Sequence, residues 1–502
     1  IGGTPANRLI HKESNQLNIG PYFINESGDV RVLPWQEAPG RYTGSARHLT
    51  DPANKIYIGT MEEGFYEVDV NTLKAEELYK DSNEAWRLYR KDSKNTPKPV
   101  ELLPGAHGKG LYSGQGVMVF SNNGENSAAA MKYFDALSGS LSEWDGKDWK
   151  VVRRNQFVEL TGPGGIYGNT NPETDPIWAT GWDHKSVLLG VRDSQKGWTF
   201  YRLPKASHSY DGAHGWNTEW PRIRNVGTDD QPDYLMTMHG LFWRFPKLFT
   251  ADNSAGIRPR SSYLKVIGDF ARWNDELVFG CDDSAQKEFL NKRKAKGNIE
   301  GPGQSNSNLW FTSKPDELGP ATVDGAIWEK EDVQANVYSD PYMFAGWEQR
   351  CCWLQNDGKQ DITFTFEIDQ KGNNVWKELT AVQVGAGQSA YLPFTAKEQG
   401  EWIDKESNVS VSFVYTTVDT RSSASSSIFN GLSKVSEENT LGGLLYGLGK
   451  NRRALGVLAS NIENDKVIEN GYYEMSDTLA LVRKDDTQTA DFIREKFAMP
   501  HQ

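Results

Sequence analysis

The stretch that decides the fold reads KIYIGTM at residues 55–61 and GFYEV at residues 64–68. Both runs are rich in the aromatic and β-branched residues that are enriched in strands, and only two residues separate them. The pair therefore predicts a β-hairpin. Similar pairs of short β-rich runs, separated by Gly, Asp, Asn and Pro turns, recur along most of the chain, which is typical of an all-β repeat protein.

The repeated runs can be aligned as about seven units, and the shorter ones match the roughly 40 to 50 residues of a propeller blade. A repeat fold can absorb all 502 residues, because each repeat packs mainly on its neighbours. We therefore predict an all-β fold, a single seven-bladed β-propeller domain over residues 1–502. The units begin at Ile56, Val117, Ser186, Tyr234, Leu277, Arg350 and Leu444.

Local patterns add detail to this prediction. Residues 141–149 read as a strand, an Asp-Gly turn and a second strand, as expected of an outer hairpin. Residues 284–296 form the one clear helical stretch and predict a short helical insertion. Residues 384–415 are β-rich and predict a sandwich-like elaboration of the sixth blade.

The composition narrows the classes of partner. Lys and Arg number 55 against 67 Asp and Glu, which gives a net charge of −12. This acidity, without a long basic stripe, argues against nucleic acid as a partner. No apolar run approaches the length of a transmembrane helix, so we expect no membrane span. The sequence starts at Ile1 without an initiator Met or an apolar signal segment, as in a mature or trimmed chain.

Among the eight histidines, His48 lies just ahead of the first repeated strand. A histidine at the entrance of a strand is placed to titrate near neutral pH and to move protons. Arg41, Tyr42 and Arg47 lie close to it in sequence and are candidate substrate-binding residues. A single histidine is more often structural than catalytic, so the residues alone leave both interpretations open.

A second group of candidates lies in the polar and aromatic stretch 208–224. It contains Tyr210, His214, Arg222 and Arg224, and His107 before another repeated strand is its natural companion. Arg pairs with the carboxylate of an anionic sugar, while Tyr or His moves a proton. A Trp-rich loop with buried polar caps is the equally weighted alternative.

The three cysteines, at positions 281, 351 and 352, are an odd count with an adjacent pair, which is a poor disulfide framework. His239 and Cys281 end equivalent strands of neighbouring repeats, and Cys352 belongs to the next repeat. These three residues predict a structural zinc site, with buried thiols as the alternative. We expect no cofactor to be required for catalysis.

Several longer strings resemble a known enzyme family. They are PGAHGKG (104–110), SGQG (113–116), SNNGE (121–125), GWDHKS (181–186), HGWNTEWPRIR (214–224) and GPGQSNSNLW (301–310). Together they are similar to the seven-bladed β-propeller enzymes of glycoside hydrolase family 145, over most of the chain. The resemblance implies an exo-acting α-L-rhamnosidase that removes L-rhamnose linked α-1,4 to D-glucuronic acid, as in arabinogalactan protein caps degraded by gut bacteria. It also implies a periplasmic or secreted protein.

The resemblance further implies where the chemistry lies. In that family the activity depends on one histidine, which corresponds to His48, and relatives with Gln at this position lack the activity. Related ulvan lyases use His, Tyr and Arg at the opposite propeller end, for which His107, Tyr210 and Arg224 are the nearest matches. A uronate polysaccharide lyase and a non-catalytic glycan-binding propeller therefore stay open as alternatives. An ordinary glycosidase uses two carboxylates, and the sequence names no second catalytic group.

Overall fold

The computed structural model forms two compact units, residues 1–288 with 306–421 and residues 289–305 with 422–502. Each unit is described by itself, and the single domain over residues 1–502 stays a prediction. The structure describes residues 8–61, 64–80, 88–89, 91–97, 108–124, 133, 135–206, 221–228, 230–238, 240–263, 267–282, 307–313, 323–334, 337–407, 410–418, 440–448, 454–463, 466–475 and 480–497.

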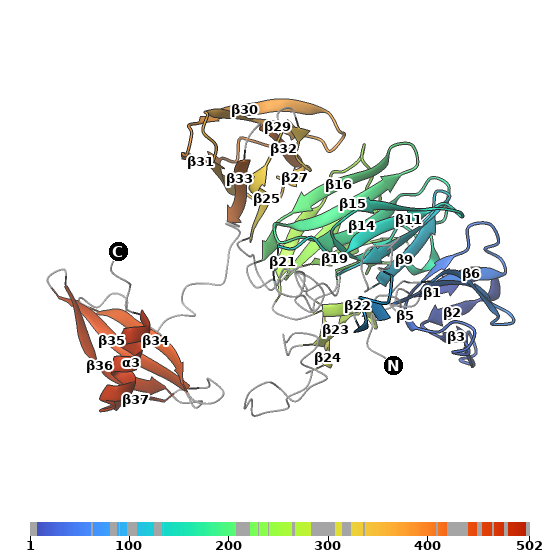
Figure 1. Cartoon of the computed structure of the whole chain (residues 1–502), viewed down its shortest axis with the longest axis horizontal. Helices are drawn as coiled ribbons and strands as arrows, with labels where there is room; N and C mark the ends of the chain where they lie inside the picture. The colour runs from blue at the N-terminus through green and yellow to red at the C-terminus, as the bar shows by residue number, and fades with distance from the viewer. Residues whose placement is uncertain are drawn as a thin grey trace. The chain divides into compact units, whose positions relative to one another are not determined.

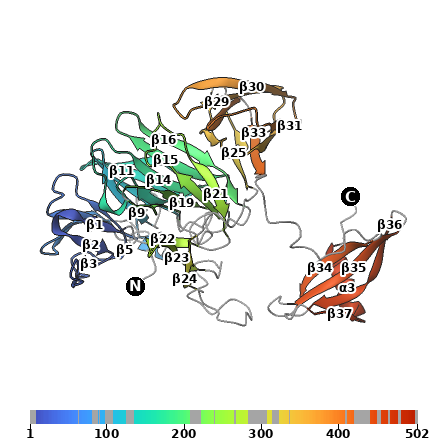
Figure 2. The same ribbon diagram turned by 180° about the vertical axis from the view of Figure 1, so that it is seen from behind.

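The first unit contains a series of antiparallel sheets in which consecutive strands pair with each other (Figures 1 and 2). The first two sheets consist of β1 (Leu9–His11), β2 (Gln16–Ile19), β3 (Tyr22–Asn25) and β4 (Val30–Val32), then β5 (Arg41–Arg47), β6 (Lys55–Met61), β7 (Gly64–Asp69) and β8 (Ala75–Lys80). The next two series are β9 (Gly108–Gly114), β10 (Val117–Asn122), β11 (Ser140–Trp144) and β12 (Trp149–Arg153), then β13 (Gln156–Thr161), β14 (Ile177–Trp182), β15 (Val187–Asp193) and β16 (Gly197–Leu203). Two further sheets contain β18 (Arg222–Asn225), β19 (Tyr234–Met238), β20 (Leu241–Phe245) and β21 (Arg258–Ser262), then β22 (Ile267–Trp273), β23 (Glu276–Asp282) and β24 (Ser307–Thr312).

The hairpins that the sequence predicts are confirmed. β6 pairs with β7 over the KIYIGTM and GFYEV runs, and β11 pairs with β12 across the Asp-Gly turn. The described strands make the chain nearly all β.

The first strands of successive sheets lie next to one another, in the order β1, β5, β9, β13, β18 and β22. At Gly110 in β9 this approach is so close that an added Cβ would lie 2.5 Å from the carbonyl oxygen of Val158 in β13. Ser121 reinforces the contact, because its hydroxyl donates to that same carbonyl oxygen and accepts from the Gly110 N–H. The sheets therefore follow one another side by side, as propeller blades do, while the number of blades and the closure of a ring stay predictions.

A two-layer β-sandwich is formed mainly by strands that follow the last of these sheets in sequence, within residues 323–418. One layer contains β17 (Lys205–Ala206), β25 (Val323–Asp332), β28 (Gln349–Asn356), β31 (Ser389–Phe394) and β33 (Ser410–Val418). The other contains β26 (Val337–Tyr338), β27 (Tyr342–Met343), β29 (Ile362–Asp369), β30 (Trp376–Val384) and β32 (Trp402–Ser407), and joins β16 through a parallel pairing with β27.

This sandwich corrects the prediction for the sixth repeat. The runs starting at Arg350 and Ile362 do not form a hairpin, because β28 pairs with β31 and β33 while β29 pairs with β30 and β32. The alternating side chains of both strands, Leu354 of β28 and Phe364 of β29 among them, instead enter one core from opposite layers. The β-rich character expected of residues 384–415 is confirmed.

The second unit contains an antiparallel four-stranded sheet and the helix α3 (Thr487–Phe497). The helix was not expected from the sequence, although Asp486 is a recognisable start signal, since its carboxylate accepts a hydrogen bond from the Thr489 N–H at 3.0 Å. Ala490 and Ile493, three residues apart, are buried in the same apolar cluster as Leu458. The predicted helical insertion at 284–296 lies outside the described residues. The strands are β34 (Thr440–Leu448), β35 (Ala454–Glu463), β36 (Lys466–Met475) and β37 (Leu481–Lys484).

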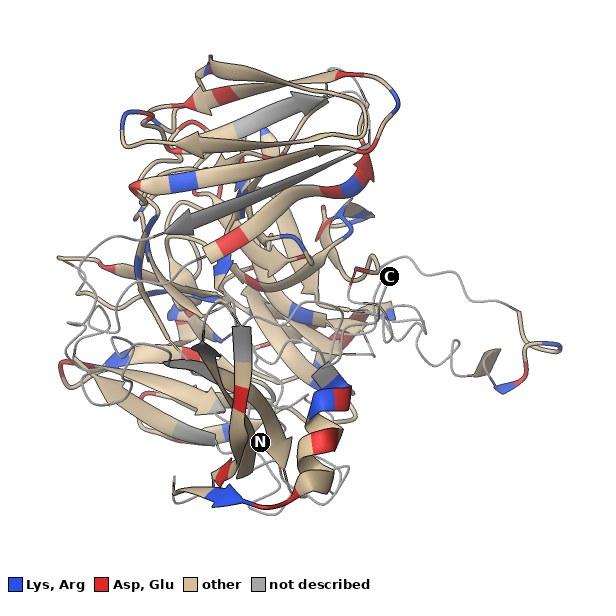
Figure 3. Cartoon of the chain, turned by 90° about the vertical axis from the view of Figure 1, so that its left-hand side faces the viewer, with Lys and Arg blue, Asp and Glu red and all other residues tan. Residues whose placement is uncertain are grey.

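The distribution of charge and the apolar character of the helices bear on the expected absence of nucleic acid and membrane partners. Basic and acidic residues are interspersed along the described strands, and no continuous basic stripe is visible among them (Figure 3). Within the described ranges, no helix is both long enough and apolar enough to cross a membrane.

Gly64, at the start of β7, gives a test of the strand geometry. Its φ is +143°, and a Cβ there would lie 1.9 Å from the carbonyl oxygen of Tyr79 in β8. We expect Gly64→Ala to destabilise the protein by roughly 1 to 3 kcal/mol, because β8 must move and the backbone is strained. Scanning calorimetry measures the fall in Tm.

Gly116→Ala is the matched control for this prediction. Gly116 also has a positive φ, +74°, but no atom lies within 4 Å of its added Cβ. The Gly116→Ala substitution therefore introduces backbone strain without a steric clash, and the Tm of this variant should fall less than that of Gly64→Ala. An equal fall in the two variants would contradict the close packing of β7 against β8.

Candidate active site

His48 directly follows β5 and is buried, with 8% of its surface exposed. Its Nδ1 accepts hydrogen bonds from the backbone N–H groups of Thr50 at 3.2 Å and Asp51 at 2.9 Å. Its Nε2 lies 2.6 Å from Oε2 of Glu67. Because Nδ1 is an acceptor, the ring hydrogen belongs on Nε2, which donates to Glu67. His48 therefore lies in the connection between β5 and β6, ahead of the strand 55–61, and its side chain is buried.

The register of β6 and β7 builds the floor of this site. Tyr57 of β6 lies directly opposite Glu67 of β7, so their side chains share one face of the hairpin. The His48 ring stacks on the Tyr57 ring, with centroids 4.5 Å apart and planes 29° from parallel. The Leu49 N–H donates to the Tyr57 hydroxyl at 3.4 Å, which ties the segment after His48 to the same strand.

Glu67 is the carboxylate that the sequence did not single out. Burial alone would raise the pKa of Glu67, but hydrogen bonds from Lys55 and His48 outweigh it and hold the pKa below its ordinary value. The side chain is 16% exposed and stays charged at neutral pH. The available signal was an acid inside the otherwise apolar run GFYEV, whose partner only the strand register reveals.

The other candidates near His48 in sequence separate in space. Arg47, the last residue of β5, pairs with Glu13, with Nη1 3.1 Å from Oε2. Arg41 and Tyr42 begin β5, and an extended strand of seven residues places its ends about 20 Å apart. The Tyr42 hydroxyl donates to the Ala38 carbonyl oxygen at 2.6 Å, and burial raises its pKa to about 12. Only Arg47 thus lies at the same end of β5 as His48.

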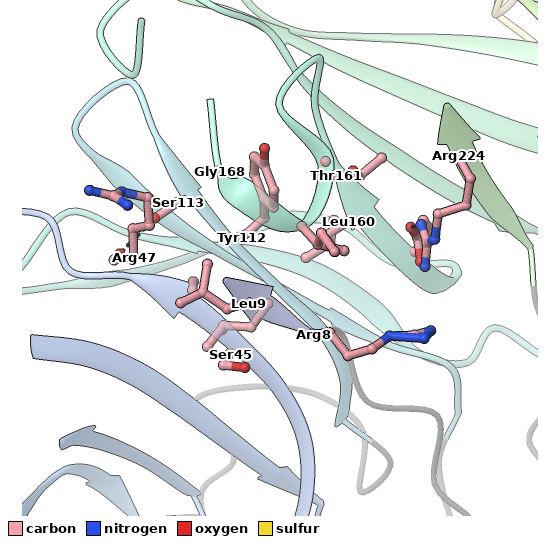
Figure 4. A pocket seen from close by; sticks show the side chains of 15 residues that line it. Arg8, Leu9, Ser45, Arg47, Tyr112, Ser113, Leu160, Thr161, Gly168 and Arg224 are labelled. Atoms are coloured by element: carbon pink, nitrogen blue, oxygen red, sulfur yellow. Dashed lines mark hydrogen bonds and ion pairs between the residues drawn. The ribbon is translucent and has the colours of Figure 1, made fainter. Parts of the chain in front are cut away.

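A small pocket lies beside this end of β5 (Figure 4). Its volume of about 20 Å³ admits roughly one water molecule and is too small for a sugar ring. In Figure 4 Arg47 and Ser113 lie at one side, while Arg8 and Arg224 extend toward the opposite corner. His48 and Glu67 do not line this pocket.

At the alternative lyase-type end, Arg222 and Arg224 are described. Both donate to Glu159 of β13, and the Arg222 and Glu159 side chains are each 1% exposed. Both arginines are therefore already paired with a carboxylate of the protein. The other members of this predicted site, His107, Tyr210 and His214, lie outside the described residues.

The predicted metal site stays a prediction. Cys281 lies in the apolar cluster that contains Phe279, and Cys352 lies in the core of the sandwich. His239 is not among the described residues. Within the described part of the chain, no group of three or more His, Cys, Asp and Glu side chains is placed to hold a metal ion.

Comparisons with known proteins establish no family. No family model matches the chain, and no curated protein matches it. Among solved structures, it is similar to an exo-β-1,3-galactanase from Phanerochaete chrysosporium, with 5% identity over 80% of this chain and 100% of that chain and a TM-score of 0.25. It is also similar to a GH32 β-fructofuranosidase from Bombyx mori, with 9% identity over 80% of this chain and 94% of that chain and a TM-score of 0.24. A glycoside hydrolase family 43 arabinoxylan arabinofuranohydrolase from Bacillus subtilis shares 9% identity over 81% of this chain and 75% of that chain, with a TM-score of 0.19. TM-scores this low support neither a family nor an activity for this chain.

The lowered pKa of Glu67 predicts a pH-dependent contribution to stability. A carboxyl whose folded pKa is depressed stabilises the fold above its unfolded pKa, and this contribution is lost as the pH falls through the folded pKa. We therefore expect the Tm of the wild type to exceed that of Glu67→Gln most at neutral pH. Calorimetry between pH 7 and pH 3 should show this difference shrinking on acidification.

Glu378→Gln serves as the control, because Glu378 is exposed on β30. Its Tm difference from the wild type should change little with pH. If the Glu67→Gln difference is also constant with pH, the charged contacts of Glu67 with His48 and Lys55 do not form in solution.

Proposed function

We propose that the chain is an exo-acting α-L-rhamnosidase that removes L-rhamnose linked α-1,4 to D-glucuronic acid from acidic plant glycans such as arabinogalactan proteins. The observation that carries the proposal is the 2.6 Å contact between His48 Nε2 and Glu67 Oε2. It joins the histidine that the family resemblance singles out to a carboxylate, so that a group able to exchange protons lies in contact with a negative charge. A periplasmic or secreted location, where such glycans are met, belongs to the same proposal.

In the proposed mechanism, His48 exchanges a proton with the departing glycosidic oxygen or with the attacking water. Glycosidases generally divide the acid and base roles between two carboxyl groups, and in this proposal the imidazole of His48 takes the place of one of them. Glu67 stays ionised beside the ring and stabilises the positive charge when His48 is doubly protonated. That form also carries a hydrogen on Nδ1, so the N–H groups of Thr50 and Asp51 must turn away from Nδ1 in the working state.

Replacing His48 tests the assignment. We expect His48→Gln to lower rhamnose release by at least about 100-fold, because Gln cannot exchange a proton near neutral pH. Free rhamnose is measured from a rhamnosyl-glucuronic acid disaccharide. Circular dichroism and Tm are recorded in parallel, since the buried ring also packs on Tyr57.

His11→Gln is the matched control. His11 is likewise buried, and its Nε2 and Nδ1 lie 2.8 Å and 2.7 Å from the Pro52 carbonyl oxygen and the Ser14 hydroxyl. The His11→Gln variant should lose stability without a loss of kcat comparable to that of His48→Gln. Equal losses of kcat in the folded His11 and His48 variants would reduce His48 to a structural residue.

Product analysis separates the proposal from its alternatives. A lyase leaves an unsaturated uronate that absorbs in the ultraviolet, whereas a hydrolase releases rhamnose without it. If ultraviolet absorbance rises and His107→Ala or Tyr210→Phe abolishes the rise while His48→Gln does not, the lyase-type end is the working site. Binding of the disaccharide without any product over long incubation would instead identify a glycan-binding protein.

A further inference from the structure

Five charged residues gather where β13, β18 and β22 meet, and we call them the arginine cluster: Arg8, Glu159, Arg222, Arg224 and Asp269. Arg222 Nη1 lies 2.9 Å from Oε2 of Glu159, and Arg224 donates to the other oxygen of the same carboxylate. Arg224 Nε lies 3.3 Å from Oδ1 of Asp269, and Arg8 pairs with Oδ2 of Asp269. All five are therefore linked through two carboxylates.

The arginine cluster holds more positive than negative charge, because three guanidinium groups share two carboxylates. The Nε of Arg222 is buried and has no hydrogen-bond partner among the described residues, and the nearest Asp269 oxygen lies 3.6 Å away. Burial, together with the neighbouring guanidinium groups, lowers the pKa of both Arg8 and Arg222 to about 10. Among the described residues, three guanidinium groups thus face only two carboxylates, and an unbalanced buried charge is costly, so a negative ligand here would be stabilising.

The space beside the cluster limits the size of such a ligand. Arg8, Glu159 and Arg224 line the small pocket of about 20 Å³, which admits roughly one water-sized group (Figure 4). Arg8 and Asp269 also line a second, more open pocket of about 430 Å³. A sugar ring does not fit the small pocket, whereas a halide ion or one end of a carboxylate does.

We propose that the arginine cluster binds one small monovalent anion, chloride or the carboxylate group of a small acid, close to Arg8 and Arg224, the two arginines that line the small pocket. One excess positive charge among the described residues and room for about one water-sized group match one such anion. The site is separate from His48 and Glu67, which do not line the small pocket, and it does not depend on the proposed glycosidase activity.

The experiment titrates the protein with sodium chloride or sodium formate against sodium HEPES at constant ionic strength. We expect Tm to rise by roughly 2 to 4 °C and to saturate, because a ligand that binds only the folded state stabilises it. The two salts distinguish a halide site from a carboxylate site. Crystals soaked in bromide should show an anomalous peak within hydrogen-bond distance of the Arg8 or Arg224 guanidinium.

Arg8→Gln is the decisive variant, because it removes the excess charge and leaves the pairing of Glu159 with Arg222 and Arg224. Its side chain is 30% exposed, so the change should be tolerated. We expect it to abolish the saturable rise in Tm. Arg272→Gln is the matched control on β22, where Arg272 pairs with Asp275 outside the cluster, and it should keep the rise.

Two results would overturn the proposal. One is a wild-type protein with neither a saturable rise in Tm nor a bromide peak, which would mean that the cluster takes no anion. The other is an Arg8→Gln variant that keeps the full rise, which would place any bound anion elsewhere. The bromide peak in the wild type decides the matter if Arg8→Gln fails to fold.

Discussion

Burial of both faces of the repeated sheets is the constraint on which the rest of the structure depends. β10 and β14 are buried at every residue, because each lies in a sheet covered on its two sides. Such strands have no solvent-facing side to carry polar groups, and an unsatisfied polar group inside would be costly. Polar side chains such as His48 and Arg222 therefore lie at strand ends or where first strands meet. His48 follows the end of β5, and Arg222 begins β18.

His48 and the arginine cluster satisfy this constraint in different ways. The difference affects how the effects of mutations should be interpreted. Both ring nitrogens of His48 have hydrogen-bond partners, so its burial leaves neither nitrogen unsatisfied. Glu159 is 1% exposed and depends on Arg222 and Arg224 for its charge balance. Removing one partner of a buried ion pair costs about 3 to 5 kcal/mol. Loss of activity in an Arg222 variant would therefore reflect destabilisation of the cluster, and would not by itself show a contact between Arg222 and substrate.

The sequence predicted what is local and missed what depends on pairing. The hairpin of β6 and β7 follows from β-rich composition and a two-residue connection, both visible in the chain. The prediction for the sixth repeat was wrong because buried and exposed side chains alternate around Phe364 in the same way in a propeller blade and in a sandwich. Arg41 was grouped with His48 by sequence distance, although an extended strand separates them.

Glu67 shows where the prediction of the site fell short. Nineteen positions separate it from His48, and no spacing motif connects the two. What joins them is the register in which Glu67 faces Tyr57, together with the stacking of the His48 ring on that tyrosine. Register follows from how whole strands pair, so the sequence could name the histidine without naming its carboxylate.

The contrast between the two buried histidines of this region argues for the assignment of His48. His11 bonds to the Pro52 carbonyl oxygen and the Ser14 hydroxyl, while Glu13 lies 3.7 Å away and is engaged by Arg47. His48 instead donates directly to a carboxylate that Lys55 keeps ionised. A carbonyl and a hydroxyl hold a ring in place, whereas a carboxylate in direct contact also offsets the charge that a proton brings. Of the two, His48 is the one whose ring is in direct contact with a carboxylate.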